Sequence, residues 1–141
     1  MKVLFFCPMW GLADMPVSDM LYQVKNAGYD GIEFGFREDY KYKDAFTALI
    51  KKTGLLTIAQ QCFAVGDDFE TYKSSFKRNL EWLVSFRPLL INSHTGRDYY
   101  HTKEITQLIN LAESIEQASG IKVLHETHQH KPSKNTVEFE F

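Results

Sequence analysis

The sequence predicts an α/β fold in which about five parallel β-strands alternate with four α-helices. Five short apolar runs, starting near residues 2, 30, 55, 89 and 122, are separated by segments whose apolar residues have helical spacing. Such alternation indicates a parallel sheet with right-handed crossovers. Neither the G-x-G-x-x-G nor the G-x-x-x-x-G-K-[ST] fingerprint of nucleotide-binding sheets occurs. Polar residues instead follow several strands, as on the active-site face of a (β/α) barrel, so the pattern favours barrel geometry over a doubly wound sheet.

The first two βα units are bounded by prolines and glycines. The run Lys2–Cys7 is predicted to be a strand buried on both faces, which the following proline ends. Apolar residues then repeat at helical spacing over 16–28, starting at a proline and closing at a glycine. The next strand is predicted over 30–35. Asp39 is placed to cap a second helix that ends at Gly54.

The rest of the chain follows the same plan. The remaining strands are predicted over 55–64, 89–93 and 122–127. Asp67 and Glu70 have the spacing of a capping box, and they predict a helix that ends before Pro88. Thr102 is placed to cap the last helix, which Gly120 closes. No linker interrupts the alternation, so a single domain is expected.

The composition suits a cytoplasmic protein without a strong charge bias. The 141 residues include 16 Lys and Arg against 18 Asp and Glu, a net charge of −2, so no basic surplus indicates a nucleic-acid surface. The apolar N-terminus is too short to span a membrane and lacks a signal-peptide cleavage pattern. Cys7 and Cys62 are expected on strands roughly 9–10 Å apart, too far for a disulfide, and buried thiols suit a reducing cytoplasm.

A carboxylate and three imidazoles follow the last predicted strand, in the segment K-V-L-H-E-T-H-Q-H. Side chains alternate along a strand, so Glu126 and His128 are expected on one face and His125 and Thr127 on the other. A carboxylate and an imidazole that converge at a strand end are suitable ligands for a divalent cation. The alternative for Glu126 is an ordinary ion pair with a lysine.

Four segments together resemble a known family. They are K-V-L-F-F-C-P-M-W-G at the N-terminus, D-G-I-E-F-G on the second strand, I-N-S-H-T-G on the fourth and L-H-E-T-H on the fifth. In order and spacing they resemble the sugar phosphate isomerase/epimerase family. That family is part of the xylose-isomerase-like TIM barrel superfamily, which also includes the apurinic-site endonucleases. The resemblance covers residues 1 to about 130.

The resemblance implies a metal-dependent barrel enzyme that isomerises or epimerises a small sugar or keto acid such as hydroxypyruvate. In that family the glutamate at the end of the fifth strand binds a divalent metal (Mn, Mg, Co or Zn) and acts as acid or base, and Glu126 matches it. His94 matches a substrate-pocket histidine that the nuclease relatives use as a zinc ligand. Trp10 and Glu33 are then expected to line the pocket, although Trp10 also suits a place in the core.

Several polar residues near the predicted site keep two interpretations each. His128 is either a second metal ligand or substrate contact, or a solvated loop histidine. Arg97 either binds a phosphate or hydroxyl groups of a substrate, or lies in a solvated loop. His125 is expected to pack away from Glu126. Gln60 and Gln61 alternate faces, so at most one of them points inward.

The chain is short for a complete barrel of this kind. A (β/α) barrel needs ~250 residues, so about five of its eight units are present and an incomplete TIM-type barrel is expected. The family's remaining metal ligands come from later strands. We therefore expect residues 1–130 to be the N-terminal part of the barrel. Residues 131–141 end in the atypical T-V-E-F-E-F and are expected to reflect a truncation or a reading-frame change.

Two other functions compete with a sugar isomerase. An incomplete barrel leaves its first and fifth strands unpaired, so the chain is alternatively a non-catalytic half-barrel that associates with itself or with a missing C-terminal piece. One carboxylate with one or two imidazoles holds a metal weakly, which favours low or absent activity. An abasic-site endonuclease is the least favoured, because the chain has no basic surplus and few further histidines.

Overall fold

Strands and helices alternate along the described part of the chain, residues 1–12 and 14–128 of the computed structural model. The predicted atypical tail, residues 131–141, lies outside the described residues. The elements are β1 (Phe6–Pro8), the 3-10 helix η1 (Met9–Leu12), α1 (Val17–Asn26), β2 (Gly31–Phe34), α2 (Lys43–Thr53), β3 (Leu56–Gln61), α3 (Phe69–Val84), β4 (Leu90–Ser93), α4 (Thr102–Ser119) and β5 (Lys122–His125). The α/β class and the number of strands and α-helices agree with the prediction.

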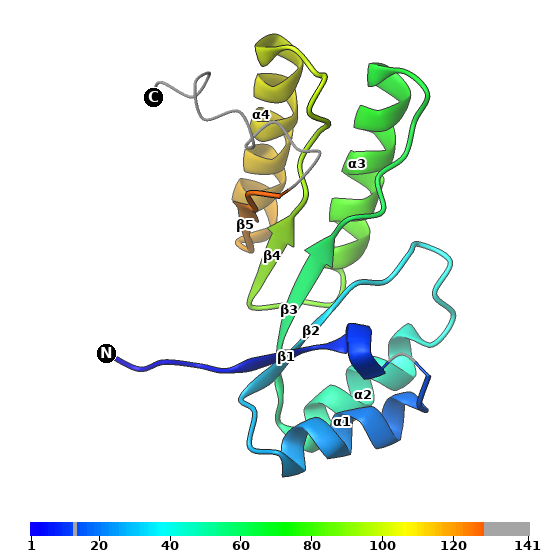
Figure 1. Cartoon of the computed structure of the whole chain (residues 1–141), viewed down its shortest axis with the longest axis vertical. Helices are drawn as coiled ribbons and strands as arrows, with labels where there is room; N and C mark the ends of the chain where they lie inside the picture. The colour runs from blue at the N-terminus through cyan, green and yellow to red at the C-terminus, as the bar shows by residue number, and fades with distance from the viewer. Residues whose placement is uncertain (13, 129–141) are drawn as a thin grey trace.

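The five strands form one parallel sheet in the order β1-β2-β3-β4-β5 (Figure 1). Each strand therefore pairs with the next one along the chain. A doubly wound sheet reverses its strand order at a switch point, whereas a (β/α) barrel adds its strands in sequence. The observed order is that of a barrel, and it confirms the predicted partial barrel.

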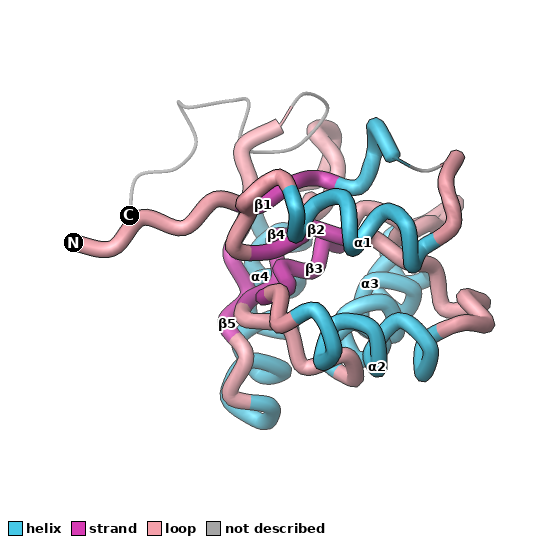
Figure 2. Tube along the Cα trace, turned by 90° about the horizontal axis from the view of Figure 1, so that it is seen from below, coloured by secondary structure: helices cyan, strands magenta, loops and turns pink. Residues whose placement is uncertain are grey.

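One face of the sheet is covered by the helices, and the main core lies there (Figure 2). Ile32, Phe34, Ala59 and Ile91 alternate along the strands and are fully enclosed. The helices contribute Met20, Leu21, Phe46, Phe76, Leu80, Leu83 and Leu108 to the same core. Burying each of these large side chains stabilises the fold by roughly 1.5–3 kcal/mol, so this layer holds the strands in register.

The opposite face of the sheet is much more open. Leu56 on β3 is 41% exposed and Leu124 on β5 is 46% exposed, whereas their helix-facing neighbours are buried. In a closed barrel this face would be the filled interior. Phe5 and Val3, just before β1, are also exposed, at 64% and 58%. The prediction of a first strand buried on both faces is therefore wrong, because the described residues cover only one face.

Several strand ends differ from the predicted ones. The first strand begins at Phe6 rather than Lys2 and includes Pro8, which is tolerated because β1 is an edge strand and proline lacks only a donor that an edge can spare. The third strand ends at Gln61 rather than residue 64. The fifth ends at His125, so Glu126 follows the strand rather than belonging to it.

The helix caps also differ from the predicted ones. Asp68, not Asp67, caps α3, because its Oδ1 accepts the Thr71 N–H at 2.8 Å and its Oδ2 accepts the Thr71 hydroxyl at 2.9 Å. Asp39 does not cap α2, because residues 37–40 form a separate turn and the helix begins at Lys43.

The last helix has the same kind of shift. Thr102 is its first residue rather than its cap, and Glu104 accepts the N–H of His101 at 2.8 Å. In both α3 and α4 the predicted helix exists and its start is displaced by one residue.

Cys7 and Cys62 do not form a disulfide, as predicted, but both are only half-buried. Burial raises the pKa of the Cys7 thiol, so this group stays protonated near neutral pH. Within residues 1–12 and 14–128, every helix is too short or too polar to cross a membrane.

Candidate functional site

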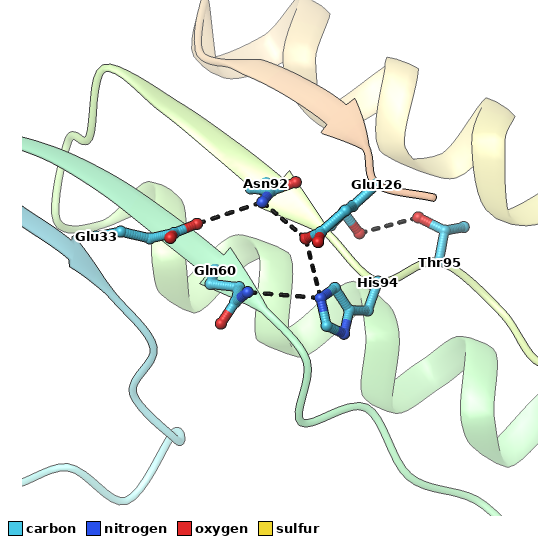
Figure 3. A network of polar contacts seen from close by, with 7 residues as sticks. Glu33, Gln60, Asn92, His94, Thr95 and Glu126 are labelled. Carbon is cyan, nitrogen blue, oxygen red and sulfur yellow. Dashed lines mark hydrogen bonds and ion pairs between the residues drawn. The ribbon is translucent and has the colours of Figure 1, made fainter. Parts of the chain in front are cut away.

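The carboxyl ends of β2, β4 and β5 bring two carboxylates to one amide (Figure 3). The Nδ2 group of Asn92 donates to Glu33 Oε1 at 3.2 Å and to Glu126 Oε2 at 2.8 Å. Glu33 lies on β2 and Asn92 on β4, on the face of the sheet away from the helices, while Glu126 directly follows β5. Glu33 lies 59 positions before Asn92 in the sequence, and Glu126 lies 34 positions after it. The three side chains meet because parallel strands end at the same edge of the sheet.

His94 forms the second contact of Glu126. Its Nε2 lies 3.0 Å from Glu126 Oε2 and 3.4 Å from Gln60 Nε2, and the side chain is buried. The tautomer of the ring decides whether Nε2 donates to Glu126 or accepts from the Gln60 amide, because one nitrogen cannot do both. We call Glu33, Gln60, Asn92, His94 and Glu126 the strand-end cluster. It gathers two carboxylates, two amides and an imidazole in one place.

His128 adds a second imidazole to the strand-end cluster. Its ring stacks on that of His94 with centroids 4.5 Å apart. Since Glu126 and His128 both contact His94, the predicted sharing of one face by these two residues is confirmed. His125 lies on the other side, where its Nδ1 is 2.6 Å from the Thr95 hydroxyl. Burial lowers the pKa of His125, so the neutral form of this ring is favoured.

Arg97 and Trp10, two predicted substrate residues, lie outside these contacts. Arg97 Nη2 donates to the Ala64 carbonyl at 3.3 Å, and its guanidinium lies over the Tyr72 ring, 5.3 Å from the centroid. Burial raises the pKa of Tyr72, whose hydroxyl donates to the Gly96 carbonyl. Arg97 therefore ties the loops after β3 and β4 together. Trp10 lies on η1 and is 59% exposed.

Sequence reasoning missed Asn92, whose amide joins the two carboxylates of the cluster. The signal was a polar residue inside the apolar run L-L-I-N-S, two positions before His94 and hence on the same face of the strand. The sequence predicts that at most one of Gln60 and Gln61 points inward, and it does not indicate which one. The structure assigns Gln60 to the strand-end cluster, whereas Gln61 is buried on the helix side with no hydrogen-bond partner among the described residues.

The described residues do not fit a complete metal site. Zinc in proteins takes about four ligands and Mg²⁺ about six. Within the described part of the chain, no group of three or more His, Cys, Asp or Glu side chains is arranged to hold an ion. Glu126 and His94 are adjacent, but the Glu126 oxygen nearest to His94 also accepts from Asn92. Among the described residues, the predicted metal ligand Glu126 is therefore not part of a group of three or more such ligands.

The strand order, with the strand-end cluster at the carboxyl edge of the sheet, defines part of a TIM-type (β/α) barrel. The chain is similar to the apo crystal structure of 3-keto-D-glucoside 4-epimerase, YcjR, from E. coli, with a TM-score of 0.70 and 17% identity over 92% of this chain and 58% of that one. It is also similar to a family 2 AP endonuclease from Brucella melitensis, with a TM-score of 0.59 and 15% identity over 87% of this chain and 55% of that one.

These likenesses are of fold, and they agree with the fold that the sequence resemblance predicts. The chain spans less than two thirds of either solved chain, which fits a partial barrel. No protein-family model matches the sequence, and no curated protein matches it.

Proposed function

We propose that this chain is part of a sugar isomerase or epimerase in which Glu126 transfers a proton at a carbon next to a carbonyl. The observation that supports the proposal is the strand-end cluster, in which the Asn92 amide donates to Glu126 Oε2 and His94 Nε2 lies 3.0 Å from the same oxygen. The expected substrates are small sugars, sugar phosphates and keto acids such as hydroxypyruvate. A general base of this kind contributes roughly 10²–10⁴ in rate.

The proposed reaction begins when the Glu126 carboxylate removes the proton from the carbon beside the carbonyl. The electron pair of the broken C–H bond moves to the carbonyl oxygen, and an enediolate forms. Return of the proton to the former carbonyl carbon, while the proton of the neighbouring hydroxyl passes to the former carbonyl oxygen, gives an isomer. Delivery of a proton to the opposite face of the original carbon, with the carbonyl re-formed, gives an epimer. Glu33, held by the same Asn92 amide, is a second carboxyl group within the site. The side chains of Asn92 and His94 fix the orientation of the base.

The remaining predicted site residues are proposed as substrate contacts. His128 is exposed and stacked on His94, so it is placed to bind substrate hydroxyl groups. Arg97 is half-buried and is proposed to act mainly by fixing the loop after β4. Trp10, on η1 directly after β1, is proposed to cover the substrate at the β1 edge of the sheet.

A divalent metal, Mn²⁺, Mg²⁺, Co²⁺ or Zn²⁺, is implied by the family resemblance and supplies charge stabilisation of an enediolate when bound. The described residues offer Glu126 and His94 as ligands, and this pair leaves an ion mostly hydrated. We propose that the chain binds Mn²⁺ only weakly, with a dissociation constant in the millimolar range or above in calorimetry. Stoichiometric binding at micromolar Mn²⁺ would contradict this proposal.

A second candidate function is a non-catalytic half-barrel that associates with itself. It is supported by the outer edges of β1 and β5, which no other described strand pairs, and by exposed apolar side chains on the open face, such as Leu56 and Leu124. An abasic-site endonuclease is supported less, since the net charge is −2 and the likeness to an AP endonuclease concerns fold alone. We propose the cytoplasm as the compartment because Cys7 and Cys62 are thiols.

The test is turnover of a panel of ketoses, ketose phosphates and hydroxypyruvate, with and without added Mn²⁺. Wild type is expected to convert one class slowly, and Glu126→Gln is expected to abolish the conversion. Glu70→Gln, which removes the same charge from an exposed site on α3 that pairs only at the surface with Lys73, is the matched control. Turnover by Glu126→Gln equal to that of wild type would contradict the proposal.

A further inference from the structure

A cavity of about 510 Å³ lies at the opposite end of the sheet from the strand-end cluster. It is bounded by α2, by the start of β3 and by the turn from α3 into β4, so it lies near the amino ends of these two strands. Its volume is within the range of small-molecule pockets. None of its lining residues takes part in the proposed proton transfer.

The polar groups that line this cavity are cations and hydroxyls. Lys51 and Arg87 supply two positive charges, and Thr47, Thr57 and Ser85 supply three hydroxyl groups. No Asp or Glu is among the described residues that line it. Within the described part of the chain, neither Lys51 nor Arg87 takes part in an ion pair. The cavity therefore has a positive potential that nothing described in its walls neutralises.

A third cation lies next to the cavity. Lys43 Nζ donates to the Ser85 hydroxyl at 2.6 Å and lies over the rings of Trp82 and Phe86, 4.9 and 5.2 Å from their centroids. These contacts hold the Ser85 side chain in place and add positive charge at the cavity wall. The Ser85 hydroxyl itself donates to the Trp82 carbonyl, so the hydroxyl donors for a ligand are those of Thr47 and Thr57. Together with the charges of Lys51 and Arg87 they suit an anion with several oxygens.

The backbone of Arg87 is an independent indication that its side chain has a role. Its φ is +54°, and it is the one non-glycine residue with positive φ among the described residues. Glycine adopts this conformation freely, whereas a residue with a Cβ is strained in it. Strained backbone is concentrated at functional sites, and this residue lines a basic cavity.

The rest of the lining is apolar. Ile50, Leu55, Phe86 and Pro88 form the inner wall, and Leu89 lies exposed at the edge. A free inorganic anion would leave this surface uncovered, whereas an anion with an apolar group would bury both parts. We propose that the cavity binds a phosphate monoester that carries an apolar group, with the phosphate at Lys51 and Arg87 and the apolar group against Phe86 and Ile50.

The test is isothermal titration of the full chain with phenyl phosphate, inorganic phosphate and phenol at pH 8, where a phosphate monoester is a dianion. Phenyl phosphate is expected to bind with one-to-one stoichiometry and at least about tenfold more tightly than inorganic phosphate. Phenol is expected to give no measurable binding. Absence of phenyl phosphate binding, or equal affinity for inorganic phosphate, would overturn the proposal.

Three variants locate the binding. Lys51→Gln with Arg87→Gln is expected to weaken phenyl phosphate binding at least about tenfold. Lys25→Gln, which removes one exposed charge from α1, is expected to leave it unchanged. Glu126→Gln is also expected to bind normally, so the result does not depend on the proposed proton transfer. Unchanged affinity in the double variant would overturn the proposal.

One further variant keeps the proposal testable if the double variant of Lys51 and Arg87 does not fold. Arg87→Gly removes the strained side chain, so it is expected to raise the Tm while losing most of the affinity for phenyl phosphate. Wild-type affinity in Arg87→Gly would contradict the assignment of this side chain to the anion.

Discussion

At the scale of single residues, Asn92 holds the strand-end cluster together. Its amide donates to Glu33 and to Glu126, and His94 Nε2 contacts the same oxygen of Glu126. Two carboxylates that approach each other repel, and a shared donor between them offsets part of that repulsion. The position of the proposed base therefore depends on a neutral amide that performs no chemistry itself.

Asn92→Asp tests this dependence through stability alone. A third carboxylate replaces the donor, so the free energy of unfolding at pH 7 is expected to fall by about 1–3 kcal/mol, as measured by urea denaturation. The loss is expected to shrink toward pH 4, because a proton on one of the carboxyl groups restores a donor. Asn110→Asp, on the exposed side of α4, is the control and is expected to change stability by less than about 0.5 kcal/mol. A loss no greater than that of the control would contradict the role of Asn92.

Sequence reasoning found the ionisable members of this cluster, left the choice between Gln60 and Gln61 open, and missed Asn92. Glu126 and His94 follow apolar runs, so their place at strand ends could be predicted, and Glu33 interrupts one. Asn92 lies inside a run that reads as buried strand, and its value depends on a glutamate 59 positions earlier in the chain. Contacts of this kind arise from strand register, which single-sequence patterns do not determine.

At the scale of elements, periodicity predicted the helices and strands but not their ends. The apolar spacing of α3 was sufficient to predict the helix, but Asp67 was predicted as its cap and the neighbouring Asp68 is the observed one. Asp68 wins because its carboxylate reaches both the N–H and the hydroxyl of Thr71. Asp39 was equally plausible for α2, but a local turn at residues 37–40 delays that helix. Such competition between nearby polar groups is decided by backbone geometry.

The two aspartates before α3 provide a direct test of the cap. Asp68→Ala is expected to lower the Tm by about 3 °C, and Asp67→Ala is expected to have little effect. Asp68→Asn is expected to stay near wild type at pH 7, since asparagine also caps helices. Thermal unfolding followed by circular dichroism distinguishes the three variants. A larger loss in Asp67→Ala than in Asp68→Ala would contradict the assigned cap.

The same cap makes a prediction about pH. The backbone N–H and hydroxyl of Thr71 lower the pKa of Asp68 below its ordinary value of 3.8. The carboxylate therefore stabilises the fold fully above that ordinary value and loses the contribution as pH falls through the lowered pKa. The Tm of wild type is expected to fall more than that of Asp68→Asn below pH 4. Parallel pH profiles for the two proteins would contradict this assignment.

At the scale of the whole molecule, the described residues form a sheet that they cover on one face and whose two outer edges they leave unpaired. β1 and β5 lie at opposite ends of the strand order, with Phe5 and Leu124 exposed beside them. A closed barrel removes both features, because its first and last strands pair and its interior is filled. An open sheet with exposed apolar side chains favours association with another chain.

Self-association is therefore expected at tens of micromolar protein. Light scattering coupled to size exclusion is expected to give a mass above that of the 16.4 kDa chain. Phe5→Lys with Leu124→Lys is expected to shift the mass toward the monomer, because a charge at an edge opposes strand pairing. Val65→Lys, at an exposed site in the loop after β3, is the control. A monodisperse wild-type monomer would contradict this prediction.

The central claim is that Glu126, held at the carboxyl edge of this partial barrel, takes a proton from carbon. The most direct measurement is deuterium uptake from D₂O into hydroxypyruvate and a panel of ketoses, followed by proton NMR. Exchange detects proton removal even when product forms slowly. The account predicts uptake by at least one compound at least about tenfold faster with wild type and Glu70→Gln than with Glu126→Gln. Equal uptake with all three proteins would contradict it.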